Sequence, residues 1–386
     1  MKDFTLKSFF ASYPHINLAT EADNQDILDF YHQQSLTSKE SDIIYERGNN
    51  FFSFLKERSE NSLVLLMRND SGFIQGMGVL SYRPGFIDGR AVTVGYLGDL
   101  RVKLNRKLIR EWRSMYANLM RLSPSMKETF YCSHYQTVLI DDNGESRNNL
   151  AETKIDNLYY QRLAGYKMVN IIARINLFKT EYHIRWATSS DKKLISTFLQ
   201  TIFKRSLFAH DWSLEFDRRL EAWNNFSIQD HILVFDSQGN LNAVTSIWNP
   251  VKTKQIKLTS IPKGMKLLHK FLKILPLIDA KKLPEENSVI DIMYVNQINF
   301  EDSLNFESRR KIAQEIMHFS FEKKFNMLAY ADFENENFLG DCKTLIMQKM
   351  SMALFSVHYK EDEGNVIAPL SWVGEDSTPT FDMSLV

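Results

Sequence analysis

Residues 93–122 contain two hydrophobic periods in immediate succession. In the first ten residues, TVGYLGDLRV, the residue character alternates and β-branched side chains recur, as in a strand. The apolar residues that follow recur at helical spacing. We therefore predict a strand that turns directly into a helix, an arrangement whose unpaired backbone N–H groups favour phosphate. Such sites are usually lined with glycine, but this turn has none and carries four cations: Lys103, Arg106, Lys107 and Arg110.

A second pattern recurs after 168 residues. The segment ATEADNQDILDF begins at Ala19 and ATSSDKKLISTF begins at Ala187, with Thr, Asp, Ile and Phe in register. In each copy a short strand precedes an aspartate at a helix start and then an amphipathic helix. The repeat indicates a duplicated chain.

The same order of elements follows both copies. In the first half we predict a helical segment at 45–60, an antiparallel hairpin at 62–84, and the strand and helix of residues 93–122. Another strand at 128–139, a helical patch at 149–165 and a final strand pair at 166–178 follow. In the second half we predict a hairpin at 231–250, a strand at 288–299, a helix at 306–325 and two strands at 326–333 and 350–359. The helical segment 263–283 is an insertion in this order.

Length and composition fit a globular α/β protein with two domains. The chain has 386 residues, above the usual limit of about 250–300 for a single core. Hydrophobic residues make up 44% and charged residues 24%, which is ordinary for a folded protein. We predict domains at 1–180 and 181–386, joined near Lys179–Tyr182.

Charge and cysteine content exclude several classes of protein. Forty-seven basic residues balance 47 acidic ones, so no global field attracts nucleic acid or an anionic membrane, and any basic site must be local. Cys132 and Cys342 lie too far apart for metal-ligand spacing, and we expect no metal site and a cytoplasmic protein. The most apolar segment, 264–283, is interrupted by charges and Pro276 and cannot span a bilayer. We therefore expect neither a nucleic-acid nor a membrane partner.

The order of elements resembles that of the GCN5-related N-acetyltransferase superfamily. The segment YLGDLRVKLNRKLI is similar to its acyl-CoA motif, a Leu-x-Val strand followed by an Arg-Gly-x-Gly turn, and DNLYYQRLAGYKMV is similar to its later tyrosine motif. The resemblance implies two tandem domains of this type, each a mixed, mostly antiparallel sheet flanked by helices, with the second half degenerate. It also implies a central strand that splays from its neighbour and pairs with the pantetheine arm of acetyl-CoA, the co-substrate.

Matching Val102 to the motif valine assigns the acyl-CoA site. Lys107 then takes the motif arginine position, and Leu108 and Arg110 take the two glycine positions. The cofactor-binding residues implied are Leu100, Arg101, Val102, Arg106, Lys107, Leu108, Ile109 and Arg110.

Two interpretations of the basic turn stay open. The cations either replace close backbone contact with charge-assisted bonds to the pyrophosphate, or form the solvated face of a helix whose apolar face is Leu108, Trp112, Met115 and Leu119. Cations at a helix N-terminus oppose the helix dipole, which favours the first interpretation. In the second half the corresponding turn carries Glu301 and Asp302, which would repel an anion.

The chemistry of acyl transfer to an amine adds three candidate catalytic residues. A lysine-like amine must lose a proton, and Asp99 on the strand or His134 on the next strand is the candidate base. By the motif, Tyr160 returns a proton to the CoA thiolate, with Tyr159 as the alternative in a register shifted by one residue. Each of these also has a structural interpretation, as an ion-paired or packed residue, and Cys132 fits a core thiol better than a nucleophile.

We therefore predict an N-acetyltransferase that acts on an amine of a small molecule or peptide, with the first half catalytic. The alternatives are an aminoacyl or longer-chain acyl transferase and a non-catalytic acyl-CoA-binding or protein-interaction module. Two aromatic-rich segments, 35–60 and 205–226, are expected to shape the acceptor cleft or to fill the core. A homodimer is left open.

Overall fold

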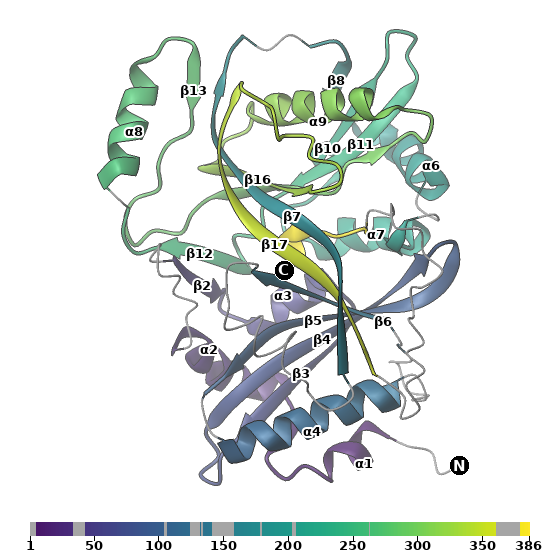
Figure 1. Cartoon of the computed structure of the whole chain (residues 1–386), viewed down its shortest axis with the longest axis vertical. Helices are drawn as coiled ribbons and strands as arrows, with labels where there is room; N and C mark the ends of the chain where they lie inside the picture. Colours follow the sequence, from purple (N-terminus) through teal and green to yellow (C-terminus); the bar gives the residue numbers. More distant parts are fainter. Residues whose placement is uncertain are drawn as a thin grey trace.

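One large sheet runs through both halves of the chain, with helices packed on its faces (Figure 1). The computed structural model describes residues 5–33, 43–103, 106–123, 132, 134–140, 158–177, 180–202, 206–261, 263–359 and 379–386. The predicted linker residue Lys179 lies outside these ranges. Within them, no helix is long and apolar enough to cross a membrane.

The elements of the first half follow the predicted order as far as the fourth helix, except that residues 45–47 of the helical segment predicted at 45–60 belong to a strand. They are α1 (Leu6–Phe10), β1 (Ile16–Leu18), η1 (Glu21–Asp23), α2 (Asn24–Gln33), β2 (Ile43–Arg47), α3 (Phe51–Arg58), β3 (Asn61–Arg68), β4 (Ile74–Ile87), β5 (Arg90–Val102), α4 (Arg106–Leu122), β6 (His134–Ile140) and β7 (Leu158–Ile175).

The second half repeats this order with additional short strands. Its elements are β8 (His183–Trp186), η4 (Ser189–Asp191), α6 (Lys192–Ile202), β9 (Leu207–His210), α7 (Trp212–Ala222), η6 (Ile228–Asp230), β10 (His231–Phe235), β11 (Leu241–Trp248), β12 (Lys254–Leu258), α8 (Lys263–Ile274), β13 (Ile278–Ala280), β14 (Ile292–Val295), β15 (Asn299–Phe300), α9 (Phe306–Ser320), β16 (Met327–Phe333), β17 (Leu345–Tyr359) and η7 (Met383–Leu385).

Strand order and direction are the same in the two halves. The first half reads β1-β3-β4-β5-β6-β17 and the second reads β8-β10-β11-β14-β16-β7. In each path the fourth and fifth strands are parallel, and all other neighbours are antiparallel. This is the mixed, mostly antiparallel arrangement that the superfamily resemblance implies for the tandem domains.

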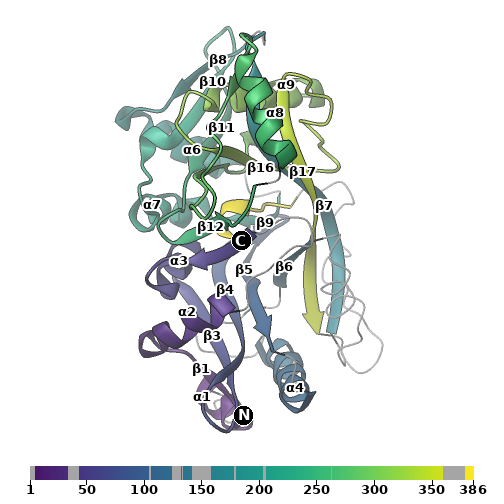
Figure 2. The ribbon, with the colours of Figure 1, turned by 90° about the vertical axis from the view of Figure 1, so that its left-hand side faces the viewer.

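The halves exchange their last strands, which the sequence does not predict. β7 of the first half completes the sheet of the second, and β17 completes the sheet of the first. The two strands also pair with each other from Leu158–Tyr359 to Arg174–Leu345, so the two sheets are joined into one (Figure 2). The boundary between 1–180 and 181–386 stays a prediction, because these two strands cross it.

The sequence repeat corresponds to a repeated helix start. The backbone N–H of Thr20 donates to the Asp23 carboxylate at 2.8 Å, and that of Thr188 donates to the Asp191 carboxylate at 2.7 Å. These carboxylates satisfy donors that precede the helix. Ile27 and Ile195, which the repeat aligns, are both fully buried.

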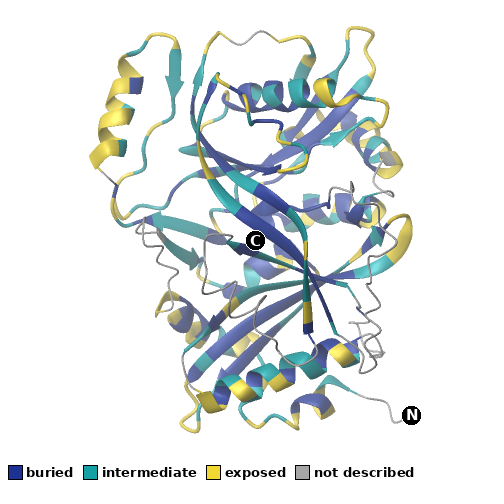
Figure 3. Cartoon of the chain, in the orientation of Figure 1, coloured by how far each residue is buried: buried dark blue, intermediate teal, exposed yellow. Residues whose placement is uncertain are grey.

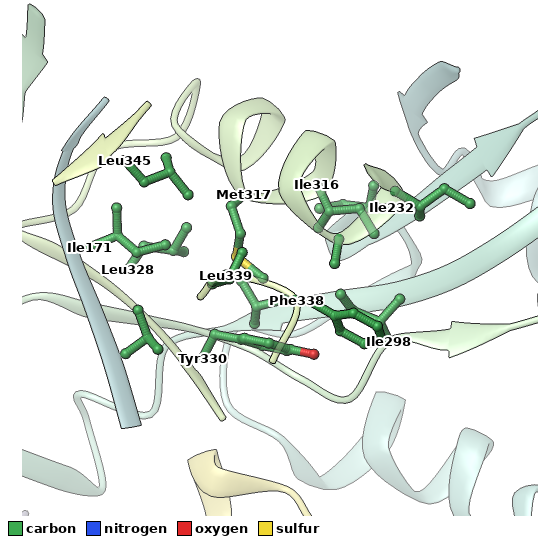
Figure 4. Packing of buried hydrophobic residues seen from close by; sticks show 14 of the residues in the cluster. Ile171, Ile232, Ile298, Ile316, Met317, Leu328, Tyr330, Phe338, Leu339 and Leu345 are labelled. Carbon is green, nitrogen blue, oxygen red and sulfur yellow. The ribbon is translucent and has the colours of Figure 1, made fainter. Parts of the chain in front are cut away.

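The exchanged strands also connect the cores. In the second half, Ile316 and Met317 of α9 belong to the same buried cluster as Ile171 of β7, the strand that the first half contributes to the sheet of the second (Figure 4). In the first half, Val357 of β17 packs with Trp112 of α4. The central strands are therefore buried along much of their length (Figure 3).

The helical patch predicted at 149–165 is wrong where the structure describes it. Residues 149–157 lie outside the described ranges, and Leu158–Gly165 is the first part of β7. Short apolar runs do not distinguish strand from helix by periodicity alone, and here the partner strand β17 decides the conformation. The predicted strand at 288–299 is also divided, into β14 and β15.

Candidate functional site

The parallel strands β5 and β6 separate part of the way along their length. They pair only from Val94–His134 to Leu97–Thr137, and at the last pair the Thr137 hydroxyl donates to the Leu97 carbonyl at 2.9 Å. Beyond this point β5 pairs with β4 and β6 pairs with β17. The described strands thus form the opening that the superfamily resemblance implies, and β5 leads from it to α4.

A β-bulge lies on β5 directly beyond this point. Gly98 pairs with Val79 and Arg101 with Met77, so Asp99 and Leu100 together oppose the single residue Gly78. Asp99 has a φ of 51°, in the left-handed region. A Cβ on Gly78 would lie 3.1 Å from the Trp112 ring, and glycine here lets α4 approach the bulge.

Two buried arginines hold the Asp99 side chain, which is only 5% exposed. Arg47 donates to one carboxylate oxygen at 2.5 Å, and both terminal nitrogens of Arg58 donate to the other at 3.2 Å. Burial alone would raise the pKa of Asp99, but these cations hold it well below its usual range. A carboxylate so stabilised is a weak proton acceptor. The contacts favour a role in fixing the bulge, and a role as the base stays a prediction.

Arg101, predicted to bind the cofactor, stacks on an aromatic ring, and its charge also helps to lower the pKa of Asp99. Its guanidinium lies 3.7 Å from the centre of the Tyr31 ring, and the residue is buried. The flanking residues Leu100 and Val102 are exposed and half-buried, respectively. Leu100 is therefore the more accessible part of this predicted site.

The other predicted base, His134, lies at the start of β6. Burial lowers its pKa, and its Nδ1 has no hydrogen-bond partner among the described residues. Two residues earlier, the Cys132 thiol donates to the backbone carbonyls of Thr93 and His134. Burial raises the pKa of Cys132 to about 12, which fits a core thiol.

Tyr160 lies on strand β7 and not in the helical patch predicted at 149–165. Tyr160 pairs with Val357 of β17, and Val357 pairs with Tyr135 of β6. Tyr135 lies two residues before Thr137, where the pairing of β5 and β6 ends. Its hydroxyl lies 3.3 Å from that of Tyr116 on α4, and burial raises its pKa to about 12. These contacts favour a packed tyrosine. Its role as the acid stays a prediction, and the alternative, Tyr159, is partly exposed.

The first turn of α4 is cationic and exposed. Arg106, Lys107 and Arg110 are exposed, whereas Leu108 is buried and Ile109 half-buried. The apolar face predicted for this helix, Leu108, Trp112, Met115 and Leu119, is confirmed as buried. Lys107 lies close enough to His15 and Asp70 to influence their pKa values, whereas Arg106 and Arg110 share a helix face at i and i+4. Residues 104–105 of the turn lie outside the described ranges.

A small pocket, with a cavity volume of about 40 Å³, lies between the two halves. The first half contributes Arg58, Ser59, Ser81, Tyr82, Arg83, Val94, Tyr96 and Gln136, and the second contributes His210, Thr380, Phe381, Asp382, Leu385 and Val386. Both aromatic-rich segments predicted to shape an acceptor cleft therefore supply lining residues. Arg58 links the pocket to the bulge, because its Nε donates to the Leu385 carbonyl and its terminal nitrogens bond Asp99.

A buried charged cluster lines one side of this pocket. Asp382 lies 2.7 Å from His210 Nε2 and accepts from Arg219 at 2.5 Å. Arg219 also donates to Glu215 at 2.7 Å and lies 2.9 Å from His210 Nε2. Burial, Arg83 and Arg219 lower the pKa of His210 to about 4. Sequence reasoning missed this cluster, because His210 and Asp382 lie 172 positions apart and neither belongs to a motif.

Three buried histidines predict a pH-dependent stability. Burial lowers the pKa values of His210, His231 and His318 to about 4. Between about pH 4 and their unfolded pKa of about 6.5, only the unfolded chain binds these protons, so stability is lost as the pH falls. We expect the free energy of unfolding to decrease by about 1 kcal/mol per pH unit for each histidine in this window. Urea unfolding at pH 7 and pH 5 measures it, and equal stabilities at the two values would contradict the assignment.

Comparison with known proteins supports the fold. No family model matches the sequence, and no curated protein matches it significantly. Among solved structures, Saccharomyces cerevisiae N-myristoyltransferase with bound myristoyl-CoA has a TM-score of 0.55 at 8% identity, over 90% of this chain and 80% of that one. A second structure of the yeast enzyme, with myristoyl-CoA and inhibitors, has a TM-score of 0.55 at 9% identity, over 93% and 83% of the two chains.

A third neighbour has the fold named in the resemblance. The GCN5-related glucosamine N-acetyltransferase region of a fungal multi-domain GH3 β-N-acetylglucosaminidase has a TM-score of 0.58 at 11% identity, over 88% of this chain and 38% of that one. The chain therefore has the GCN5-related N-acetyltransferase fold, in the tandem arrangement described above.

Proposed function

We propose that the protein is an acyl-CoA-dependent N-acyltransferase. The separation of β5 from β6 beyond Leu97 and Thr137 carries the proposal, because it leaves a strand edge that leads directly to a cationic helix start. A pantetheine arm can pair with such an edge as an additional strand does, and a pyrophosphate at its end is suited to the helix N-terminus. The yeast structures of the same fold, which hold myristoyl-CoA, support this use.

In this proposal side chains replace the missing glycines at the pyrophosphate. Arg106 and Arg110 project from one face of the first turn of α4, and Leu108 anchors that turn in the core. Guanidinium groups make strong, bidentate bonds to phosphate oxygens and do not need the close backbone approach that glycine permits.

The backbone beside the bulge is suited to the thioester. Two residues oppose one at Asp99–Leu100, so the ladder to β4 is interrupted and backbone polar groups are redirected. A fixed backbone N–H near the thioester carbonyl stabilises the oxyanion that forms when an amine attacks. Arg47 and Arg58 would hold this geometry by fixing the Asp99 side chain.

The pocket between the halves is the proposed acceptor site, and His210 is the proposed base. His210 Nε2 lies 2.7 Å from Asp382, which can only accept a hydrogen bond, and 2.9 Å from a terminal nitrogen of Arg219, which can only donate one, so the two contacts favour opposite tautomers of the imidazole. Nδ1 is buried without a hydrogen-bond partner among the described residues and lies 3.9 Å from Glu215 Oε1. In the tautomer that donates from Nε2 to Asp382, His210 would take a proton from the attacking amine through Nδ1, with Asp382 as a positioning residue. His134 is a second candidate, on the same face of β6 as the lining residue Gln136.

The length of the acyl group separates two versions of the proposal. The sequence predicts acetyl-CoA as the co-substrate, whereas the yeast structures contain myristoyl-CoA. The test is release of the CoA thiol from acetyl-CoA and from myristoyl-CoA in the presence of small amines and of peptides with a free amine. Amine-dependent thiol release from either donor supports acyl transfer, and binding without release on any acceptor favours the non-catalytic alternative.

A His210→Gln variant should lower the transfer rate by about 10²–10⁴-fold, the usual contribution of a positioned base. The affinity for acyl-CoA should stay unchanged, because the pocket is separate from the first turn of α4. His231→Gln is the matched control, since His231 is also buried but bonds the Ile228 carbonyl. Equal rates in the wild type and the folded His210→Gln variant would remove His210 from the mechanism and leave His134 as the base to test.

A further inference from the structure

Helix α8 and strand β13 form an arm at the edge of the second half (Figure 1), and this arm exposes large apolar side chains. Five large hydrophobic residues on it are between 45% and 78% exposed: Leu267, Leu268, Phe271, Ile274 and Leu277. Figure 3 shows α8 exposed over most of its length, while β13 pairs with β7 and fixes the arm to the sheet. An exposed cluster of this kind marks an interaction site.

The exposed residues form a stripe along the helix. Leu267, Phe271 and Ile274 recur after four and three positions, which places them on one face of α8. Leu272 is buried and secures the helix to the rest of the molecule. The stripe is therefore not the packing face of α8 but a second apolar face.

Lysines flank the stripe on a helix without acidic residues. Lys263, Lys266, Lys270 and Lys273 are all exposed, and no Asp or Glu occurs from residue 263 to residue 278. Lys266 bonds Glu286, at 2.8 Å. The balanced charge of the whole chain thus conceals a local cationic surface, which the sequence-based expectation of no membrane partner did not consider.

We propose that this face of α8 binds an anionic lipid surface, with the helix lying in the plane of the interface. Leu267, Phe271 and Ile274 would insert among the acyl chains, and the lysine stems would reach upward so that their ammonium groups meet lipid phosphates. The helix has only 12 residues, so it would lie on the bilayer and not span it. This inference depends on the surface of α8 and not on the proposed transferase activity.

Charge complementarity favours lipid over a second copy of the chain. In a two-fold dimer through this stripe, the four lysines of each helix would face those of the other, and like charges would oppose association. Anionic headgroups instead match both the sign of the charge and its position at the border of the apolar stripe.

The test is co-sedimentation of the full chain with vesicles of equal parts phosphatidylglycerol and phosphatidylcholine, compared with vesicles of phosphatidylcholine alone. We expect at least about tenfold tighter binding to the anionic vesicles, weakened when the salt concentration is raised to about 0.5 M. Leu267→Ser with Phe271→Ser should reduce the binding at least about tenfold, and so should Lys270→Glu with Lys273→Glu. All four side chains are exposed, so these variants should keep the melting temperature of the wild type.

Leu214→Ser with Phe306→Ser is the matched control, because both residues are exposed on other helices. This variant should bind vesicles as the wild type does. Equal binding to both vesicle types, no binding to either, or binding unaffected by the α8 variants would overturn the proposal. A dimer in solution that the Leu267→Ser, Phe271→Ser variant converts to a monomer would assign the stripe to a second copy instead.

Discussion

An Asp99→Asn variant is expected to have a free energy of unfolding about 3–5 kcal/mol lower than that of the wild type. Asp99 is buried between Arg47 and Arg58, at 2.5 and 3.2 Å, and the substitution leaves two buried guanidinium groups without their anion. Asparagine tolerates the left-handed backbone of residue 99, so the loss of stability would come from the removed negative charge and not from a strained backbone. Urea unfolding measures the change.

The control for this variant is Glu21→Gln, which removes an exposed carboxylate paired with Lys56 at 3.1 Å. Surface pairs of this kind contribute about 0–1 kcal/mol, so this variant should unfold almost as the wild type does. Equal, small effects of both substitutions would show that Asp99 is not structural. A stable Asp99→Asn protein that binds acyl-CoA but transfers nothing would instead restore Asp99 as the base.

Reversing two charges at the start of α4 should weaken acyl-CoA binding by about 100-fold or more. Arg106→Glu with Arg110→Glu removes two charge-assisted contacts to the pyrophosphate, each worth about 1.5–3 kcal/mol, and adds repulsion. Both side chains are exposed, so the fold should be unaffected. Isothermal titration with the donor that the wild type accepts measures the affinity.

Arg121→Glu is the matched control, because Arg121 is exposed at the opposite end of the same helix. Its affinity should equal that of the wild type. If the double variant at the first turn also binds acyl-CoA normally, the cations are only the solvated face of α4 and the pyrophosphate lies elsewhere.

The elements with strong local patterns were predictable. The apolar face of α4 and the course of α9 follow from helical periodicity, and the repeated helix starts at Thr20 and Thr188 follow from residues three positions apart. The order of strands in each half follows from the same local signals combined with the family resemblance. These features depend on residues that are close in sequence.

The predictions that were wrong or missing concern features that depend on residues distant in sequence. Leu158–Gly165 is a strand because β17, almost 200 positions later, pairs with it, and no local pattern contains that partner. The same long-range pairing exchanges the last strands of the two halves. A repeat in sequence therefore predicts the order of strands but not which half of the sheet each last strand completes.

The candidate site shows the same division. The strand and cationic helix start were visible as one continuous segment, so the acyl-CoA residues could be proposed from the motif. The bulge was not visible, and it sends Asp99 to Arg47 and Arg58 while Arg101 packs on Tyr31. The pocket pair His210 and Asp382 could not be found, because only the fold brings residues from these two segments together.

The most direct test of the account is a crystal structure of the protein with a non-hydrolysable acyl-CoA analogue. The account predicts that the pantetheine lies between Gly98–Val102 of β5 and Val138–Ile140 of β6, bonded to the β5 backbone, with the pyrophosphate at Arg106 and Arg110. A closed β5–β6 interface with the analogue bound elsewhere, or at the α9 start beside Glu301, would contradict it.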